Sequence, residues 1–161
     1  GFGRMNYDSS VFAPDKETVT LLEPDMIFSW DSYFGEKKLG DVYEWNRKGV
    51  ATYISANSGA AKIRTLENEY NDILNIGRIF DAEEKAKELV DKMKQQVEDT
   101  LAAAKGQEAV RVAVLEPISG KMTNYAANSL AGDMVTQLGG QLVKPEGNEM
   151  ARRTWWLGTR M

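Results

Sequence analysis

One predicted helix in the middle of the chain limits the possible folds more than any other feature of the sequence. From Asp81 to about Ala104, apolar residues recur at the spacing of one helix face, and Gly106 then provides a C-terminal stop. Asp81 and Glu84 have the spacing of a capping box, so we expect the helix to begin there. The apolar positions are Ala86, Leu89, Val90, Met93, Val97 and Leu101. At 1.5 Å per residue the helix would be roughly 35 Å long, which suits a spacer between two lobes.

Short apolar runs on both sides of this helix have the character of buried parallel strands. We expect strands at 26–30, 50–54 and 110–115, and a further strand that begins at Leu142. Helical patterns cover 15–22, 35–46, 66–77 and 125–138, with Asp15 as a predicted N-cap. Alternating strands and helices are typical of parallel sheets with helical crossovers. The sequence therefore predicts an α/β fold in which the long helix separates two β/α regions.

The composition removes several classes of function. The chain has no histidine and no cysteine, which excludes cysteine-based zinc sites, disulfides, thiol nucleophiles and histidine-based triads. A net charge of −4 without a basic cluster argues against nucleic-acid binding, and no apolar run reaches the length of a membrane span. The sequence also lacks a nucleophile elbow and a phosphate loop. We therefore expect a protein that is not an enzyme, with no catalytic residues, no protein-bound metal and no cofactor.

Three segments of the chain, taken in order, resemble one known family. Segment 17–27 has a glutamate, a helical turn and then Pro24-Asp25 before a strand. Segment 68–101 has a short helix that ends in Ile-Gly and then the long helix, and segment 112–140 looks like a strand and a helix that ends in Gly-Gly. Together they resemble the substrate-binding proteins of ABC importers whose two Rossmann-like lobes are joined by one long backbone helix (class III). That family includes binders of iron-siderophores, haem and cobalamin.

The resemblance implies two lobes, both of them incomplete in this chain. Residues 1–66 would form a partial N-terminal lobe, 67–106 a short helix plus the long inter-lobe helix, and 107–161 a partial C-terminal lobe. Members of the family are usually much longer, so we expect a truncated chain. The tail 151–161 matches nothing in the family, yet a shifted frame of its codons allows Leu-Val-Ala-Trp-Asp-Pro-Asp, a pattern that the family would show. We expect an out-of-frame tail, with coincidence as the alternative.

The candidate ligand site follows from a general property of open α/β sheets, which bind ligands beyond the carboxyl ends of their strands. The predicted ligand contacts are Trp30 and Tyr33 after the first strand, Ser55 and Asn57 after the second, and Tyr125 after the third. Siderophores and haem are large, partly flat and often anionic, and aromatic walls with hydroxyl or cationic groups suit them. The alternative for each aromatic residue is that its ring packs within its own loop.

The resemblance also implies a partner and a location. Glu17 matches an exposed glutamate that pairs with an arginine of the membrane permease, where it would orient docking more than tighten it; the alternative is a solvated helix charge. The implied function is capture of an iron-siderophore-type metal chelate, haem or cobalamin between the lobes, and delivery to the permease. The protein would work outside the cytoplasmic membrane, free in a periplasm or lipid-anchored.

Two other functions stay open at this point. The same fold could bind an oxyanion or another small solute. Alternatively, the truncated chain could bind nothing and self-associate, because unpaired sheet edges recruit further strands.

Overall fold

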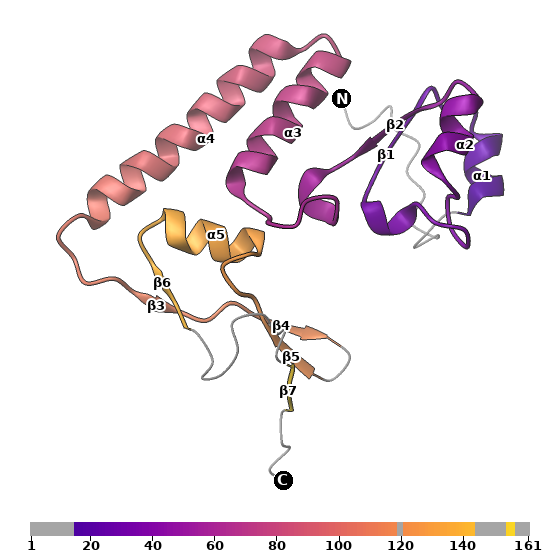
Figure 1. Ribbon diagram of the computed structural model, residues 1–161. Coiled ribbons are helices and arrows are strands. Elements are labelled where there is room, and N and C mark those ends of the chain that lie inside the picture. The colour runs from indigo at the N-terminus through magenta and orange to yellow at the C-terminus, as the bar shows by residue number, and fades with distance from the viewer. Residues whose placement is uncertain (1–14, 119–120, 144–153, 157–161) are drawn as a thin grey trace. The chain divides into compact units, whose positions relative to one another are not determined.

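The computed structural model describes residues 15–118, 121–143 and 154–156 (Figure 1). The chain divides into two compact units, Gly1–Ala60 and Ala61–Met161, and each unit has its own hydrophobic core. Strands pair in parallel within each unit, and one helix of the second unit, α4, is 22 residues long. These features confirm the predicted α/β fold with a long helix. No helix in the described part of the chain is long and apolar enough to cross a membrane.

The first unit is a small β/α unit around two parallel strands. Its elements are α1 (Lys16–Leu21), β1 (Met26–Ser29), the 3-10 turn η2 (Asp31–Tyr33), α2 (Val42–Arg47), β2 (Ala51–Ile54) and the 3-10 turn η3 (Ala56–Ser58). β1 and β2 run parallel, with Ile27 opposite Thr52 and Ser29 opposite Ile54. The predicted N-cap is confirmed, because the Asp15 carboxylate accepts a hydrogen bond of 2.7 Å from the Thr18 amide.

The core of this unit covers only one face of the sheet. Trp45 of α2 is 1% exposed and clusters with Val19, Ile27 and Leu39. On the opposite face Phe28 remains 56% exposed, with its ring centroid 5.5 Å from that of Tyr53. The prediction of a buried strand at 26–30 is therefore right about the strand and wrong about its burial, since only one side of it is packed.

The predicted helix at 35–46 is wrong over its first part. The chain instead turns back on itself, with Gly35 and Gly40 paired as an isolated bridge, and Gly40 has a φ of +79° that ordinary residues avoid. The helix α2 begins only at Val42, because Asp41 caps it and Glu44 completes a capping box. The glycines therefore set a turn where the spacing of apolar residues suggested a helix.

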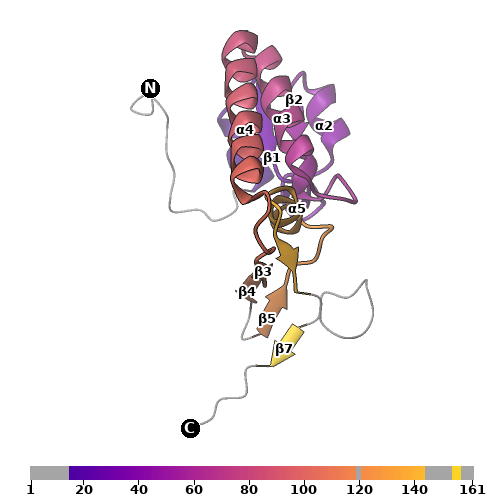
Figure 2. The same cartoon turned by 90° about the vertical axis from the view of Figure 1, so that its left-hand side faces the viewer.

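The second unit combines a helix pair with short strands. Its elements are α3 (Leu66–Ile79), α4 (Glu83–Ala104), β3 (Arg111–Val112), β4 (Leu115–Ile118), β5 (Lys121–Asn124), α5 (Leu130–Gln137), β6 (Gln141–Leu142) and β7 (Thr154–Trp156). Figures 1 and 2 show α3 and α4 lying side by side as an antiparallel pair. β3 pairs in parallel with β6, whereas β4, β5 and β7 form an antiparallel sheet.

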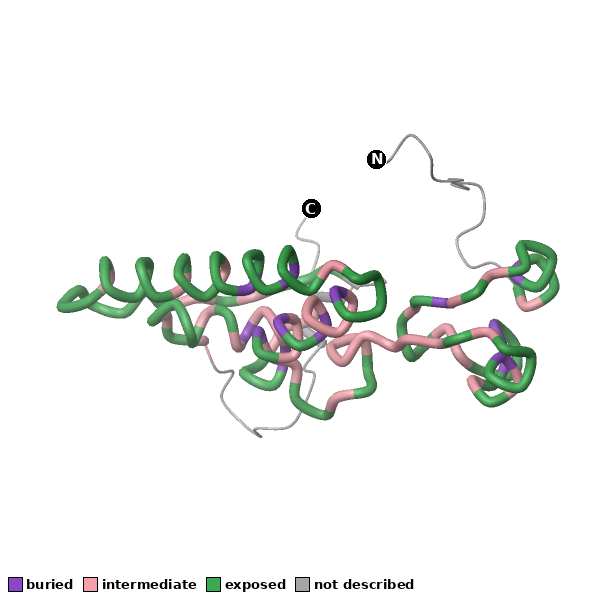
Figure 3. The backbone as a smooth tube through the Cα atoms, turned by 90° about the horizontal axis from the view of Figure 1, so that it is seen from above, coloured by how far each residue is buried: buried purple, intermediate pink, exposed green. Residues whose placement is uncertain are grey.

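The long helix is confirmed, but not its predicted start. Asp81 has a φ of +52° and lies outside the helix, and Ala82 is the N-cap without any side-chain capping bond. The Ala82 amide instead donates to the Gly77 carbonyl at 2.8 Å, so the tight turn itself joins α3 to α4. Figure 3 shows α4 exposed along most of its length, and its buried residues are Ala86 and Val90.

The region after α4 departs most from expectation. The predicted strand at 110–115 is wrong in extent, since β3 ends at Val112 and the chain enters the separate strand β4 at Leu115. The predicted helix at 125–138 is also too long, because Ser129 caps α5 through a bond from the Gly132 amide and the helix begins at Leu130. The strand predicted to begin at Leu142 is present as β6, but it begins at Gln141 and ends at Leu142.

Two sequence predictions stay predictions. The division into two units does not test the predicted domain boundaries at 66 and 106. The predicted out-of-frame tail at 151–161 lies outside the described residues except for β7, and a paired strand does not test a reading frame.

Candidate functional site

The carboxyl ends of β1 and β2 lie at the same edge of the first unit's sheet. Because Ser29 is opposite Ile54, the two chains leave that edge side by side, one towards Trp30 and the other towards Ser55. The two loops are also bonded to each other, since the Asp31 amide donates to the Ser58 hydroxyl at 3.0 Å. Parallel pairing therefore brings the two predicted loops of this unit together.

The tight packing of these loops requires a glycine. Gly59 has a φ of +145°, and a Cβ added there would lie 3.3 Å from Oδ2 of Asp31. The Ser58 hydroxyl in turn donates to the Ser55 carbonyl at 2.6 Å, which closes the turn η3 on itself. Both loops are thus fixed by bonds of their own, before any ligand is considered.

Trp30 and Tyr33 have different surroundings although both follow β1. Trp30 is 63% exposed, whereas Tyr33 is half-buried and packs against the Trp45 core. The Lys38 ammonium lies 5.1 Å from the centroid of the Tyr33 ring and donates to the Ser32 carbonyl at 2.7 Å. This edge therefore presents an exposed indole and a lysine held over an aromatic ring.

Ser55 and Asn57 are half-buried and take part in further interactions within the protein. Sequence reasoning did not select Lys38, because it lay in the stretch that was expected to be helical. The signal that could have found it is the pair of glycines at 35 and 40, which bracket Lys38 in a turn.

Tyr125 belongs to the second unit, where it lies beyond the carboxyl end of β3. Its amide donates to the Val114 carbonyl at 2.8 Å, and its hydroxyl donates to the Glu116 carboxylate. Next to it, the Asn124 amide group donates to the Val143 carbonyl at 3.4 Å, while its buried Oδ1 has no hydrogen-bond partner among the described residues. Tyr125 is thus held at both its backbone and its side chain.

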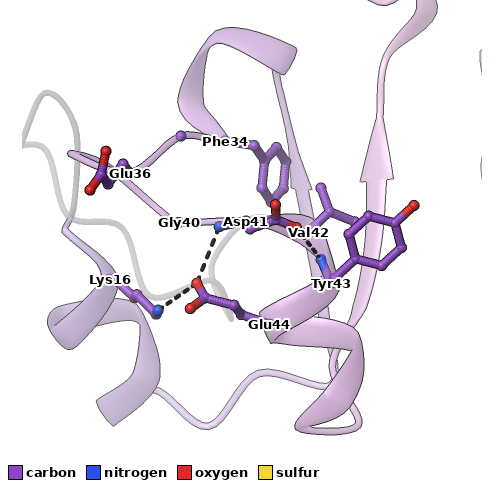
Figure 4. Close-up of a pocket in the computed structure, with 9 residues that line it drawn as sticks. Lys16, Phe34, Glu36, Gly40, Asp41, Val42, Tyr43 and Glu44 are labelled. Carbon is purple, nitrogen blue, oxygen red and sulfur yellow. Dashed lines mark hydrogen bonds and ion pairs between the residues drawn. The ribbon is translucent and has the colours of Figure 1, made fainter.

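A shallow hollow of about 670 Å³ lies elsewhere in the first unit (Figure 4). It lies at the amino ends of α1 and α2 and is lined by Lys16, Phe34, Gly35, Glu36, Gly40, Asp41, Val42, Tyr43 and Glu44. The Lys16 ammonium lies 2.7 Å from the Glu44 carboxylate, which also accepts from the Asp41 amide at 3.2 Å. The hydrogen bond from Lys16, followed by that amide bond, holds the pKa of Glu44 below its ordinary value. In this hollow, Lys16 and Glu44 are already paired with each other, and none of the predicted ligand contacts is among the lining residues.

Glu17 lies in the first turn of α1, and its side chain is exposed. Its neighbour Lys16 is engaged with Glu44, so that lysine is directed to another partner. Within the described ranges, no group of three or more acidic, histidine or cysteine side chains could hold a metal ion.

The comparisons with known proteins match one family along most of the chain. The family model for periplasmic binding proteins matches residues 8–155. No curated protein matches the chain.

Several solved structures share the fold. A periplasmic binding protein from Veillonella parvula is 27% identical with a TM-score of 0.75, and the match covers 85% of this chain and 44% of that one. A protein of the ABC-type Fe3+-hydroxamate transport system from Saccharomonospora viridis is 22% identical with a TM-score of 0.64, covering 85% and 46%. IsdE of S. aureus, solved in complex with haem, is 20% identical with a TM-score of 0.58, covering 92% and 53%. The chain therefore spans about half the length of these proteins.

Proposed function

Because the chain belongs to the periplasmic binding protein family, we propose that it is a solute-binding component of an ABC importer and not an enzyme. The family match over residues 8–155 is the observation that carries this proposal, since it extends over both units. In this role the protein works outside the cytoplasmic membrane, as a free periplasmic or lipid-anchored protein. It captures its solute without chemistry and delivers it to the permease.

The proposed solute is an iron-siderophore-type chelate, haem or cobalamin. The structural likeness to a protein of an Fe3+-hydroxamate transport system and to a haem complex supports this class. The exposed Trp30 indole offers a flat apolar contact, and Lys38 offers a cation for an anionic chelate. The proposed ligand contacts are Trp30, Tyr33, Ser55 and Asn57 in the first unit and Tyr125 in the second.

The proposed partner is the membrane permease, and Glu17 pairs with an arginine of that permease. The exposure of Glu17 and its place in the first turn of α1 support this role. An exposed ion pair at the rim of an interface guides orientation and association rate more than it adds affinity. Self-association of the chain through unpaired strand edges is the competing role.

Tryptophan fluorescence tests the solute-binding role directly. We expect saturable quenching of the full chain by a ferric trihydroxamate, haem or cobalamin, because Trp30 is exposed where the ligand is proposed to bind. The matched variant Trp30→Phe keeps an aromatic contact but should lose most of the quenching, whereas buried Trp45 still reports folding.

Other outcomes of this titration favour the competing functions. No saturable change with any of the three ligands, together with no retention of them in equilibrium dialysis, would overturn the proposal. A response to molybdate-like anions alone would favour an oxyanion binder of the same fold. If the chain sediments as a dimer and responds to none of the ligands, the self-associating fragment is favoured.

A further inference from the structure

We infer that the Glu116 carboxylate, which lies beside the proposed ligand contact Tyr125, selects the charge of the ligand and favours a chelate that carries an ammonium group over one that carries a carboxylate. This inference rests on the proposed function, because it assigns a charge preference to the same ligand site. It concerns the second unit alone and needs only the residues around β4 and β5.

The pair lies where a ligand of a parallel sheet is expected. β4 begins three residues after the end of β3, and Tyr125 directly follows β5, so both side chains lie beyond the carboxyl end of β3. Leu115 is opposite Asn124 in the β4–β5 register, which brings Glu116 close to Tyr125 at the end of the ladder. The bond from the Tyr125 amide to Val114 fixes the backbone there.

The hydrogen bond between the two side chains determines what they can offer a ligand. The hydroxyl group of tyrosine has a single hydrogen, and Tyr125 donates it to the Glu116 carboxylate. The carboxylate itself can only accept, so Glu116 offers a ligand acceptor oxygens and a negative charge. Glu116 is exposed, so its carboxylate is within reach of a solute, and Tyr125 beside it is half-buried.

The ion pairs found in the described part of the chain are Lys16–Glu44 and Lys94–Glu67, and neither involves Glu116. An ammonium group that approaches the pair can donate to it with charge assistance, whereas a carboxylate meets acceptors of its own sign. Specificity of this kind comes as much from the unfavourable contact of the wrong ligand as from the favourable contact of the right one.

The pair is more than a clamp for the hairpin. The β4–β5 ladder is already held by four residue pairs, from Leu115–Asn124 to Ile118–Lys121, and β7 extends the sheet on the other side of β5. A purely structural role would make the charge of Glu116 irrelevant to ligand choice, and that difference can be measured.

Three forms of one ferric trihydroxamate serve as probes for the full chain. One carries a free ammonium group, the second has that amine acetylated, and the third has it succinylated so that it ends in a carboxylate. Equilibrium dialysis gives the ratio of affinities for the ammonium and carboxylate forms. We expect Glu116→Gln to lower this ratio about fivefold, the size of an exposed charge interaction, because glutamine still accepts from Tyr125 but carries no charge.

Two further variants separate charge from structure. Tyr125→Phe should weaken all three probes alike and keep the ratio, because the Glu116 charge remains. Glu108→Gln removes an exposed carboxylate before β3, at the amino end of the strand, and should leave the ratio unchanged.

The outcomes distinguish this inference from the proposed function. If the wild-type chain binds the probes and Glu116→Gln lowers the ratio while Glu108→Gln does not, the inference stands. If the probes bind but the ratio is the same in Glu116→Gln, the inference is wrong and the solute-binding role is unaffected. If the wild-type chain binds none of the three, the iron-chelate proposal fails and takes the inference with it.

Discussion

The two units build their cores from different kinds of contact. In the first unit Trp45, only 1% exposed, packs with Ile27 below the covered face of the sheet, and its indole nitrogen donates to the Leu39 carbonyl at 2.6 Å. In the second unit the core lies between α3 and α4, where a Cβ added to Gly77 would be 2.4 Å from the Cβ of Ala86. One core thus depends on a large ring that fills space, and the other on the absence of a methyl group.

This difference predicts opposite responses to changes in side-chain volume. Removing volume leaves a cavity and, at Trp45, an unpaired carbonyl as well. Adding volume between α3 and α4 forces the two helices apart. The critical contact of the first core is therefore sensitive to a loss of volume at Trp45, and that of the second to a gain of volume at Gly77.

Trp45→Ala should have the largest effect. Truncation of a buried aromatic ring typically costs about 3–5 kcal/mol of the free energy of unfolding, a large part of the stability of a small domain. We expect the first unit to lose its tertiary structure while the second keeps its own, as amide signals in NMR spectra would show. The matched control is Trp30→Ala, whose side chain is exposed and should change stability by well under half as much.

A cooperative loss of signals from both units in Trp45→Ala would contradict the comparison, because it would mean that the two cores are one folding unit. Equal destabilisation by Trp45→Ala and Trp30→Ala would contradict it in another way, by removing the special role of the buried ring.

Gly77→Ala should have an intermediate effect on the second unit. The new methyl group meets Ala86, and overpacking of this kind costs about 1–3 kcal/mol, against which better helix propensity offsets up to about 1 kcal/mol. Thermal unfolding of Gly77→Ala, Ala86→Gly and the double variant gives their coupling energy. We expect the double variant to be more stable than the sum of the single effects, because Ala86→Gly makes room for the added methyl group.

Additive effects of these two substitutions would show that the helices do not touch closely at this point. A control in the first unit is Gly35→Ala, where an added Cβ meets nothing within 4 Å.

The fold could be predicted wherever local chemistry and tertiary packing agree. Asp15 caps α1 as expected, and the strands at 26–30 and 50–54 are present, because short apolar runs after a turn leave few alternatives. The failures have specific causes. Gly40 turns the chain where apolar spacing suggested a helix, and Asp81 adopts a positive φ instead of capping α4. The hairpin of β4 and β5 depends on pairing between strands, which periodicity does not reveal.

The placement of candidate residues at the sheet edge could be predicted from the sequence, but the charged groups next to them could not. The rule for parallel sheets placed Trp30 and Ser55 at one edge, and the register of β1 and β2 agrees with that placement. The residues that contact Tyr33 and Tyr125 could not be predicted from the sequence, because these contacts depend on how the side chains pack in the folded chain. Tyr33 has the Lys38 ammonium over its ring, whereas Tyr125 donates to the Glu116 carboxylate, so the two units surround similar residues with opposite charge.

The smallest predicted effect concerns acid stability and compares one ion pair from each unit. The tight Lys16–Glu44 pair, at 2.7 Å, lowers the folded-state pKa of Glu44 from its ordinary value of 4.5. A lowered pKa contributes stability above the unfolded-state value, and this contribution is lost as the pH falls through the folded-state value. Glu44→Gln should therefore lower the melting temperature near pH 7, and the difference from wild type should vanish well below pH 4.5. Glu67→Gln breaks the looser Lys94–Glu67 pair, at 3.6 Å, and should change the melting temperature less near pH 7. A larger effect from Glu67 would reverse this part of the comparison, because it would place the stronger ion pair in the second unit.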